Sequence, residues 1–315
     1  ILEGFRWQRD PKSIRRVWWL PVLMAIWANS HGGFAVGFIL WGVYAFAEVV
    51  GWIRDRSFFL NLKAFFNLKS SIQNPNFVLF WSGLLMIPAV CLNPAGPVML
   101  AYPFKTVSIG ALQDYIAEWQ SPNFHSLSVQ PFIWLLLATF AAVGISRRRL
   151  ALTDFLLVGG FVYMGLLAGR NVALFALAAP PVLARHAEPL VAALSQRLGY
   201  HGAALDSRRP RRVRLNRLLL ALLLLAVLAK AALVFPASVN QTHFTETMPV
   251  AAVEYIRATN PPGRLFNTYN WGAYLLWALP EYPVFLDGRT DLYNDEVISQ
   301  WLQVVRAEEG WQAVL

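Results

Sequence analysis

Long hydrophobic stretches alternate with short polar turns over the first three quarters of this chain. Stretches of about 20 apolar residues are typical of membrane-spanning helices. Several stretches here are shorter than that, and such segments are compatible with half-helices. The pattern predicts about seven hydrophobic segments, at residues 17–29, 34–53, 77–100, 131–145, 155–169, 172–183 and 218–235.

The pattern changes after residue 235, where amphipathic stretches replace the long apolar ones. Helical periodicity is visible at 248–259 and 295–308, and short strand-like runs at 264–268 and 283–287. Strands alternating with helices favour a small α/β domain. The expected fold is therefore an α-helical integral membrane region, residues 1–239, followed by an extracytoplasmic α/β domain, residues 240–315.

Composition supports a membrane protein, because 57% of the residues are hydrophobic and only 14% are charged. A soluble domain carries roughly 25% charged residues. Cys91 is the only cysteine, which excludes a disulfide within the chain and a thiolate metal cluster. The sequence begins with Ile1 and stops within a helical pattern, so we expect it to be an internal piece of a longer protein, incomplete at both ends.

The formal charge of +9 is concentrated in alternate turns. Basic residues occupy the opening segment and the turns near 54–69, 147–149 and 208–217, whereas the turns between them are poor in Lys and Arg. This alternation follows the positive-inside rule, so the basic turns are expected in the cytoplasm. Because topology accounts for the charge, we expect membrane lipids as partners and no nucleic acid. The expected location is the plasma membrane, crossed several times.

Polar residues that could bind a ligand or take part in a reaction lie in the outer turns. The candidates there are Asn29, His31, Asp114, Glu118, His125, Arg170 and Asn171. Residues 103–119 have helical spacing, which predicts a helix along the outer membrane surface. Asp114 and Glu118 are four residues apart on one face of it, where they could hold a divalent cation or act as base and orienting group. The alternative is an ordinary solvated helix face.

Arg170 is the sharpest of these signals. It lies at the tip of an apolar hairpin, on the side where the positive-inside rule disfavours a cation. A lipid or substrate phosphate, or a carboxylate of the chain itself, would offset its charge. His31 precedes two glycines that allow close approach of a headgroup, and His125 has no spaced second ligand for a metal.

The C-terminal region adds Asp287, Arg289 and Asp291, which follow a strand-like run. Acids at strand ends often occupy sites, but an Asp-Gly turn with an arginine is also ordinary loop chemistry, and we favour that structural interpretation.

Five separated motifs carry a family resemblance: "WANSHGGF", "CLNPAG", "IAEWQSPNFH", "GRNVALFALAAPPVLARH" and "NWGAYLLWALPEYPVFLDGRTDLY". Together they resemble a group of large bacterial membrane proteins, mostly uncharacterised, placed near the GT-C glycosyltransferases. These are relatives of protein mannosyltransferases and oligosaccharyltransferases. The resemblance implies a polyprenyl-phosphate sugar donor and a catalytic acid in the first external loop. That loop is expected upstream of Ile1, so the catalytic residue cannot be assigned here, and Asp114 and Glu118 are not its equivalents.

The sequence leaves two alternative functions. The first is a membrane glycosyltransferase of GT-C type, in which Arg170 contacts the donor phosphate of a lipid-linked sugar. His31 and Glu118 would shape the pocket. The second is a non-catalytic membrane protein, either a polymer-assembly partner or a transporter. A transporter would need ionisable groups near the bilayer midplane. No cofactor is assigned beyond a divalent cation that paired acids could hold.

Overall fold

The computed structural model describes residues 1–65, 75–110, 115–197 and 210–315. Within these ranges the chain forms two compact units, Ile1–Leu190 and Val191–Leu315. The boundary predicted at 239/240 rests on composition, and it stays a prediction. Each unit is described by itself.

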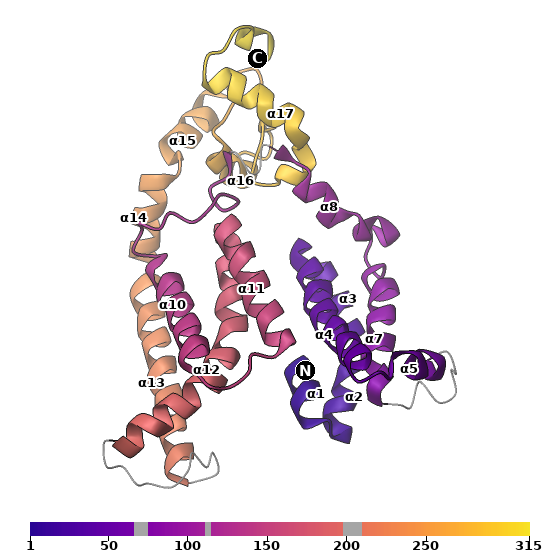
Figure 1. Cartoon of the computed structure of the whole chain (residues 1–315). Helices are drawn as coiled ribbons and strands as arrows, with labels where there is room; N and C mark the ends of the chain where they lie inside the picture. Colours follow the sequence, from indigo (N-terminus) through magenta and orange to yellow (C-terminus); the bar gives the residue numbers. More distant parts are fainter. Residues whose placement is uncertain (66–74, 111–114, 198–209) are drawn as a thin grey trace. The chain divides into compact units, whose positions relative to one another are not determined.

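The described part of the first unit is built from helices (Figure 1). They are α1 (Leu2–Gln8), α2 (Pro11–Val17), α3 (Leu20–Ser30), η1 (Gly32–Phe34), α4 (Ala35–Arg54), α5 (Phe58–Phe65), α7 (Pro75–Val90), η2 (Gly96–Leu100), α8 (Tyr102–Val107), α10 (Gln130–Ile145), α11 (Leu152–Leu167), η3 (Gly169–Asn171) and the first part of α12 (Val172–Arg197).

Local sequence explains where several of these helices begin. The Asp10 carboxylate caps α2 by accepting a hydrogen bond from the Ser13 backbone N–H, and Pro11 occupies the first turn. Proline also stands in the first turn of α3, α8 and α10. A proline there sacrifices no helical hydrogen bond and has the required φ already.

The helices pack through small residues and aromatic rings. α3 packs along α7, and α4 contacts both α7 and α11. At the α4–α7 crossing, Gly83 leaves room for the ring of Trp41, whose Nε1–H donates to the Leu79 carbonyl at 2.8 Å. The main buried cluster of this unit includes Phe5, Leu79, Phe161 and Phe175, so even the short helix α1 contributes to the core.

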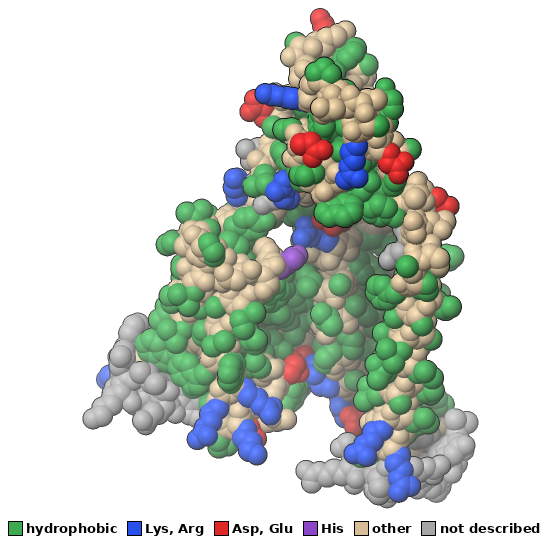
Figure 2. Space-filling model, turned by 180° about the vertical axis from the view of Figure 1, so that it is seen from behind, with side chains coloured by type: hydrophobic (Ala, Val, Ile, Leu, Met, Phe, Trp, Pro, Cys, Tyr) green, Lys and Arg blue, Asp and Glu red, His purple; other side chains and the backbone are tan. Residues whose placement is uncertain are grey.

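Much of the outer surface is apolar. Large side chains such as Trp19, Trp134 and Tyr163 are 60%, 67% and 64% exposed. Figure 2 shows hydrophobic side chains along the helix flanks in the lower half of the picture, with Lys and Arg side chains gathered near the helix ends. A soluble surface rarely carries so much contiguous apolar area. Such a surface suits contact with lipid.

Among the described residues, two helices are long and apolar enough to cross a membrane, Gly32–Arg54 and Val213–Val234. The predicted membrane region with about seven hydrophobic segments is therefore wrong. α10 and α11 have 16 residues each, which at 1.5 Å per residue reach about 24 Å of a core roughly 30 Å thick. α3 has only 11 residues, and the 77–100 segment stops being α-helical at Val90. α10 and α11 nearly match the apolar stretches predicted at 131–145 and 155–169, and those stretches are themselves shorter than a full span.

The second unit contains the end of α12 and a further set of helices. They are α13 (Pro210–Val234), α14 (Ala237–Thr247), α15 (Val250–Thr259), η4 (Tyr269–Trp271), α16 (Gly272–Ala278), α17 (Thr290–Val305) and η5 (Trp311–Ala313). Leucines cover all sides of α13, and none of its membrane-length stretch is buried. A helix that is apolar all round and unburied is typical of a membrane span.

The predicted α/β domain is wrong, because the described residues contain no strand. The two strand-like runs do lie side by side, but only one isolated parallel bridge joins them, between Leu265 and Val284. Asn267 takes the place of a ladder: its amide donates to the Leu286 carbonyl and accepts from the Phe285 N–H. A side chain thus satisfies the backbone groups that a second strand would pair.

The surface helix predicted at 103–119 is also wrong as a continuous element. α8 ends at Val107, and Ser108 and Ile109 are not helical. Ile109 is instead buried. Glu118 and Trp119 lie in a turn, and Asp114 lies outside the described residues, so the proposed Asp114–Glu118 pair is not tested.

Candidate functional site

Asn29 and His31 lie where two predicted turns meet. The Asn29 amide donates to the Leu92 carbonyl at 2.8 Å, and the Asn93 amide donates to the Ala28 carbonyl at 3.0 Å. The motifs "WANSHGGF" and "CLNPAG", distant in sequence, therefore form one corner at the ends of α3 and α7. Gly32 is required there, since a Cβ atom would come within 2.4 Å of the Tyr102 ring.

The orientation of His31 follows from this corner. Its Nδ1 accepts a hydrogen bond from the Gly33 N–H at 2.8 Å, which caps η1. In a neutral imidazole the other nitrogen then carries the proton. The exposed His31 ring can therefore donate a hydrogen bond from Nε2–H to an oxygen acceptor while its Nδ1 still accepts from the Gly33 N–H.

A second corner joins the 118–120 turn to η3. The Arg170 N–H donates to the Glu118 carbonyl at 3.0 Å, and the Gly169 N–H donates to the Gln120 carbonyl at 2.9 Å. Asn171 has a structural partner, because its amide donates to the Met164 carbonyl at 3.0 Å. Backbone bonds thus bring Glu118, Trp119 and Arg170 together, as their predicted shared location requires. We call these three residues the Arg170 corner.

The Arg170 side chain has two partners within this corner. Its guanidinium lies 4.3 Å from the centre of the Trp119 ring, a cation–π contact. It also reaches the Glu118 carboxylate, at a long 3.5 Å. Because Glu118 is 62% exposed, this ion pair is strongly screened. Arg170 also lies two residues before Val172, the first residue of α12, and a helix N-terminus favours anions. The corner can therefore accept a further anion.

The remaining outer candidate is separate from these contacts. His125 is exposed, and its backbone N–H donates to the Asn123 side chain at 3.0 Å. Across the described residues, no group of three or more His, Cys, Asp or Glu side chains is placed to hold a metal ion.

An ionic network that sequence reasoning missed lies inside the first unit. The Asp154 carboxylate accepts from Arg6 and from Arg185, both at 2.5 Å. Glu3 accepts from Arg185 at 2.9 Å and from the Tyr44 hydroxyl at 2.5 Å. Only 4% of the Asp154 side chain is exposed. We call Glu3, Arg6, Tyr44, Asp154 and Arg185 the ionic network; it ties α1 to α4, α11 and α12.

The network is electrically balanced, with two carboxylates facing two guanidinium groups. Burial raises the pKa of Glu3, but the Tyr44 hydrogen bond and the Arg185 charge outweigh that effect and lower the pKa overall. Glu3 is thus held in its charged form. A buried charge set of this kind is stable only while each partner remains in place.

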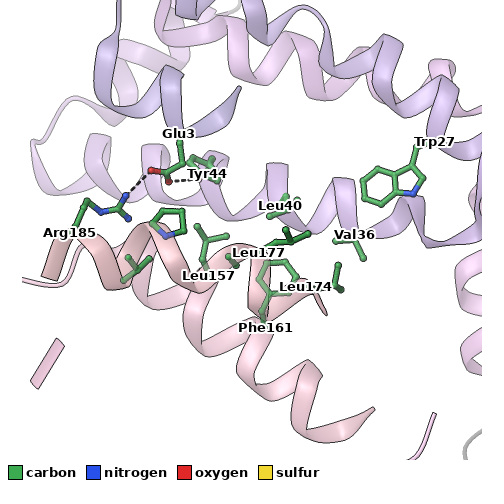
Figure 3. A pocket seen from close by; sticks show the side chains of 13 residues that line it. Glu3, Trp27, Val36, Leu40, Tyr44, Leu157, Phe161, Leu174, Leu177 and Arg185 are labelled. Atoms are coloured by element: carbon green, nitrogen blue, oxygen red, sulfur yellow. Dashed lines mark hydrogen bonds and ion pairs between the residues drawn. The ribbon is translucent and has the colours of Figure 1, made fainter. Parts of the chain in front are cut away.

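A narrow cavity of about 250 Å³ borders this network (Figure 3). Glu3, Tyr44 and Arg185 lie together at one end of it, and Trp27 and Val36 lie toward the other. The walls between are apolar side chains of α4, α11 and α12, among them Leu40, Leu157, Phe161, Leu174 and Leu177. The cavity suits an apolar chain or a small amphiphile.

The network had a weak signal in the sequence. Glu3 is the one glutamate in the strongly basic opening segment, and Arg185 follows two prolines inside an apolar stretch. Asp154 precedes the apolar stretch predicted at 155–169, where a charge is ordinary. Asp154 is 148 positions away from Arg6 along the chain, and Arg185 is 182 positions away from Glu3. No local sequence pattern connects residues that far apart.

In the second unit, Asp287 and Arg289 form a compact pair. Both oxygens of the buried Asp287 carboxylate accept from Arg289, and Tyr293 donates to Oδ2 at 2.7 Å. These bonds, with the Arg289 hydrogen bonds foremost, lower the pKa of Asp287 to about 2. A carboxylate so fully bonded has a structural role. The Asp291 side chain lies outside what the structure describes.

Comparisons with known proteins do not assign the chain to a family. No family model, no curated protein and no solved structure matches this chain.

Proposed function

We propose that this chain belongs to a membrane glycosyltransferase of GT-C type, which takes a sugar from a polyprenyl-phosphate donor at the outer face of the membrane. The family resemblance of its motifs suggests the reaction. Two helices of membrane-spanning length and an extensively apolar surface support a membrane setting. The Arg170 corner supports recognition of a lipid phosphate.

The observation that carries this proposal is that the positive charge of Arg170 is only weakly neutralised by its protein partners. The planar fork of its guanidinium lies over the Trp119 ring, and its carboxylate partner, Glu118, is exposed and 3.5 Å away. A phosphate could take two parallel hydrogen bonds from such a fork. The N-terminus of α12 would add to the attraction.

In the proposed reaction, an acceptor hydroxyl attacks the anomeric carbon of the sugar as the bond from that carbon to the phosphate oxygen breaks. The hydroxyl proton passes to a base, and polyprenyl phosphate leaves with its added charge. Arg170 would stabilise that charge as it develops. The base is not assigned to any residue of this chain. His31 could position an oxygen of donor or acceptor through its Nε2–H.

Binding of a short-chain polyprenyl phosphate by the full-length protein in nanodiscs tests the phosphate role. Arg170→Ala should weaken binding roughly 10- to 100-fold, the cost of losing a charged hydrogen-bonding partner. Arg170→Lys should recover part of it, because the charge stays and the planar fork is lost. Arg54→Ala is the matched control, since that arginine is 79% exposed and paired with Asp55.

Glu118→Gln separates phosphate binding from a purely structural ion pair. If Glu118 competes with phosphate for Arg170, the glutamine variant should bind the phosphate at least as tightly as the unmodified protein. If the pair only holds the corner together, Glu118→Gln and Arg170→Ala should both destabilise the protein, with no change in phosphate affinity for either.

A non-catalytic role is the second candidate, and the ionic network favours it. Charged side chains within a membrane protein's helix bundle commonly mark substrate or ion pathways. Here they border a cavity at Glu3, Tyr44 and Arg185. A transporter of a small amphiphile would use that cavity. Uptake or release of substrate by proteoliposomes, without any sugar transfer, would favour this function over the first.

We also propose the sides of the membrane. The basic turns at 147–149 and before α13 would face the cytoplasm, and the Arg170 corner with the region after α13 would lie outside. This arrangement rests on the alternation of basic turns.

A further inference from the structure

Three aromatic side chains of the second unit form a group on its surface. Phe244 of α14 meets Tyr274 of α16 edge to face, with ring centres 5.0 Å apart. Tyr274 lies 6.1 Å from Trp277. Trp277 is 76% exposed and Phe244 is 40% exposed, so the group presents a large apolar surface. We call these three residues the aromatic group.

Hydrogen bonding and packing hold the helices that carry the aromatic group in place. The Trp271 Nε1–H donates to the Thr247 carbonyl at 3.1 Å, which holds the end of α14 against the start of α16. Leu275 and Ala278, on the adjoining face of α16, are buried in a cluster with Val253 and Leu279, and Tyr274 packs against this cluster. The exposed rings are therefore held outward by a packed helix, and they do not belong to a loose loop.

Charged residues are sparse in the two stretches of sequence that carry the group, although the Arg257 guanidinium of α15 donates to the Ala278 carbonyl beside Trp277 at 2.5 Å. No Lys, Arg, Asp or Glu occurs between Lys230 and Glu246, or between Arg264 and Glu281. The first stretch begins in α13, whose leucine surface is exposed, and runs through α14 to Phe244. An uncharged path thus connects the helix of membrane-spanning length with the aromatic group.

We infer that the aromatic group inserts into the lipid headgroup layer on the side where α13 leaves the membrane. Trp and Tyr concentrate in this layer, because their rings are apolar at one end and polar at the other. Phe244 is the eighth residue of α14, about 10 Å along that helix from its start, whereas the headgroup layer is about 5–8 Å thick on each side, so insertion of the group requires α14 to incline toward the membrane surface. Lys230, near the end of α13, can extend its ammonium group to the same layer.

This inference rests on α13 crossing a membrane and does not depend on glycosyl transfer. It assigns the second unit a fixed contact with the bilayer surface, through uncharged aromatic rings and not through basic residues. Such a contact should therefore persist at high salt and on vesicles of neutral lipid, unlike an electrostatic attachment.

Site-directed spin labelling of the full chain in neutral phosphatidylcholine nanodiscs tests it. Cys91→Ala removes the native thiol, and single cysteines are then placed at Trp277, at Leu223 within α13, and at the exposed Glu309 as a control in the same unit. The measurement is the ratio of accessibility to oxygen, which partitions into lipid, over accessibility to a water-soluble nickel chelate.

We expect the ratio at 277 to lie several-fold above that at 309 and below that at 223, with no change in high salt. Equal ratios at 277 and 309, with a high ratio at 223, would overturn the inference while leaving α13 in the membrane. A low ratio at 223 would overturn its premise as well. A label at 277 immobilised and shielded from both reagents would also overturn it, since a protein or carbohydrate partner would then cover the rings.

Discussion

At the scale of single residues, Asp287 is a candidate site residue whose carboxylate is fully engaged in structural hydrogen bonds. Its carboxylate is buried and receives donors from Arg289 and Tyr293. Because these donors already fill its oxygens, Asp287 has no free lone pair for a substrate proton. The same contacts make it a measurable contributor to stability.

Asp287 should make the second unit sensitive to acid. Its pKa is about 2 in the folded protein against an ordinary value of 3.8. A lowered carboxyl pKa stabilises the fold above the ordinary value, and this stabilisation is lost as the pH falls from about 3.8 toward 2. We expect a contribution on the order of 1–2 kcal/mol, reduced by solvent around the exposed Arg289.

Thermal unfolding of the protein in detergent at pH 7 and at pH 3 would check this. Asp287→Asn should lower the midpoint at pH 7 and should depend less on pH over this range. A variant with the same acid dependence as the unmodified protein would assign that dependence to other groups.

Asp154 allows a second test at the same scale. Asp154→Asn leaves two partly buried guanidinium groups, Arg6 and Arg185, without their shared buried carboxylate. Removing one partner of a buried charge set typically costs about 3–5 kcal/mol, so the variant should unfold at a markedly lower temperature. Asp55→Asn is the control, because the Asp55–Arg54 pair is exposed and should be worth less than about 1 kcal/mol. Similar shifts for both variants would mean that the network contributes little.

At the scale of elements, glycines decide how closely α4 and α7 approach. A Cβ atom on Gly83 would come within 2.0 Å of the Trp41 ring, whereas one on Gly42 would meet no atom within 4 Å. The two positions lie in α7 and α4, so they form a matched pair.

Gly83→Ala should therefore destabilise the first unit by about 1–3 kcal/mol through overpacking. Gly42→Ala should be neutral or slightly stabilising, because alanine favours a helix over glycine. Both are read from the thermal midpoint in detergent. A neutral Gly83→Ala variant would show that α4 and α7 do not cross as closely as described.

At the scale of the whole molecule, the proposed sidedness is open to direct test. In a Cys91→Ala background, a cysteine at Ser126 should react with a membrane-impermeant maleimide added to intact cells. A cysteine at Lys12 of α2 should react only after the membrane is opened, because the basic turns are proposed to face the cytoplasm. Both positions have exposed or half-exposed side chains, so burial does not prevent labelling. The reverse pattern would invert the topology and remove the outer-face site.

Local sequence determined much of what the structure contains. Apolar stretches bounded by prolines and polar turns predicted helices in the right places, because helix formation and termination depend on neighbouring residues. A carboxylate was one of the predicted partners of Arg170, because a cation on the disfavoured side needs an anion, but the sequence did not single out Glu118. Helix length was only partly predictable, because α10 matches the stretch predicted at 131–145, whereas α7 ends at Val90 within the stretch predicted at 77–100.

Only the tertiary structure decided which charges meet and which backbone groups pair. Glu3, Arg6, Asp154 and Arg185 come from three separate parts of the chain, and no periodic pattern links them. Likewise, the runs around Leu265 and Val284 have strand-like composition, but the Asn267 side chain and the close approach of Gly272 to the Leu286 carbonyl leave room for a single bridge. Strand pairing and buried ion pairs depend on non-local partners, and those partners are supplied by the packing of helices.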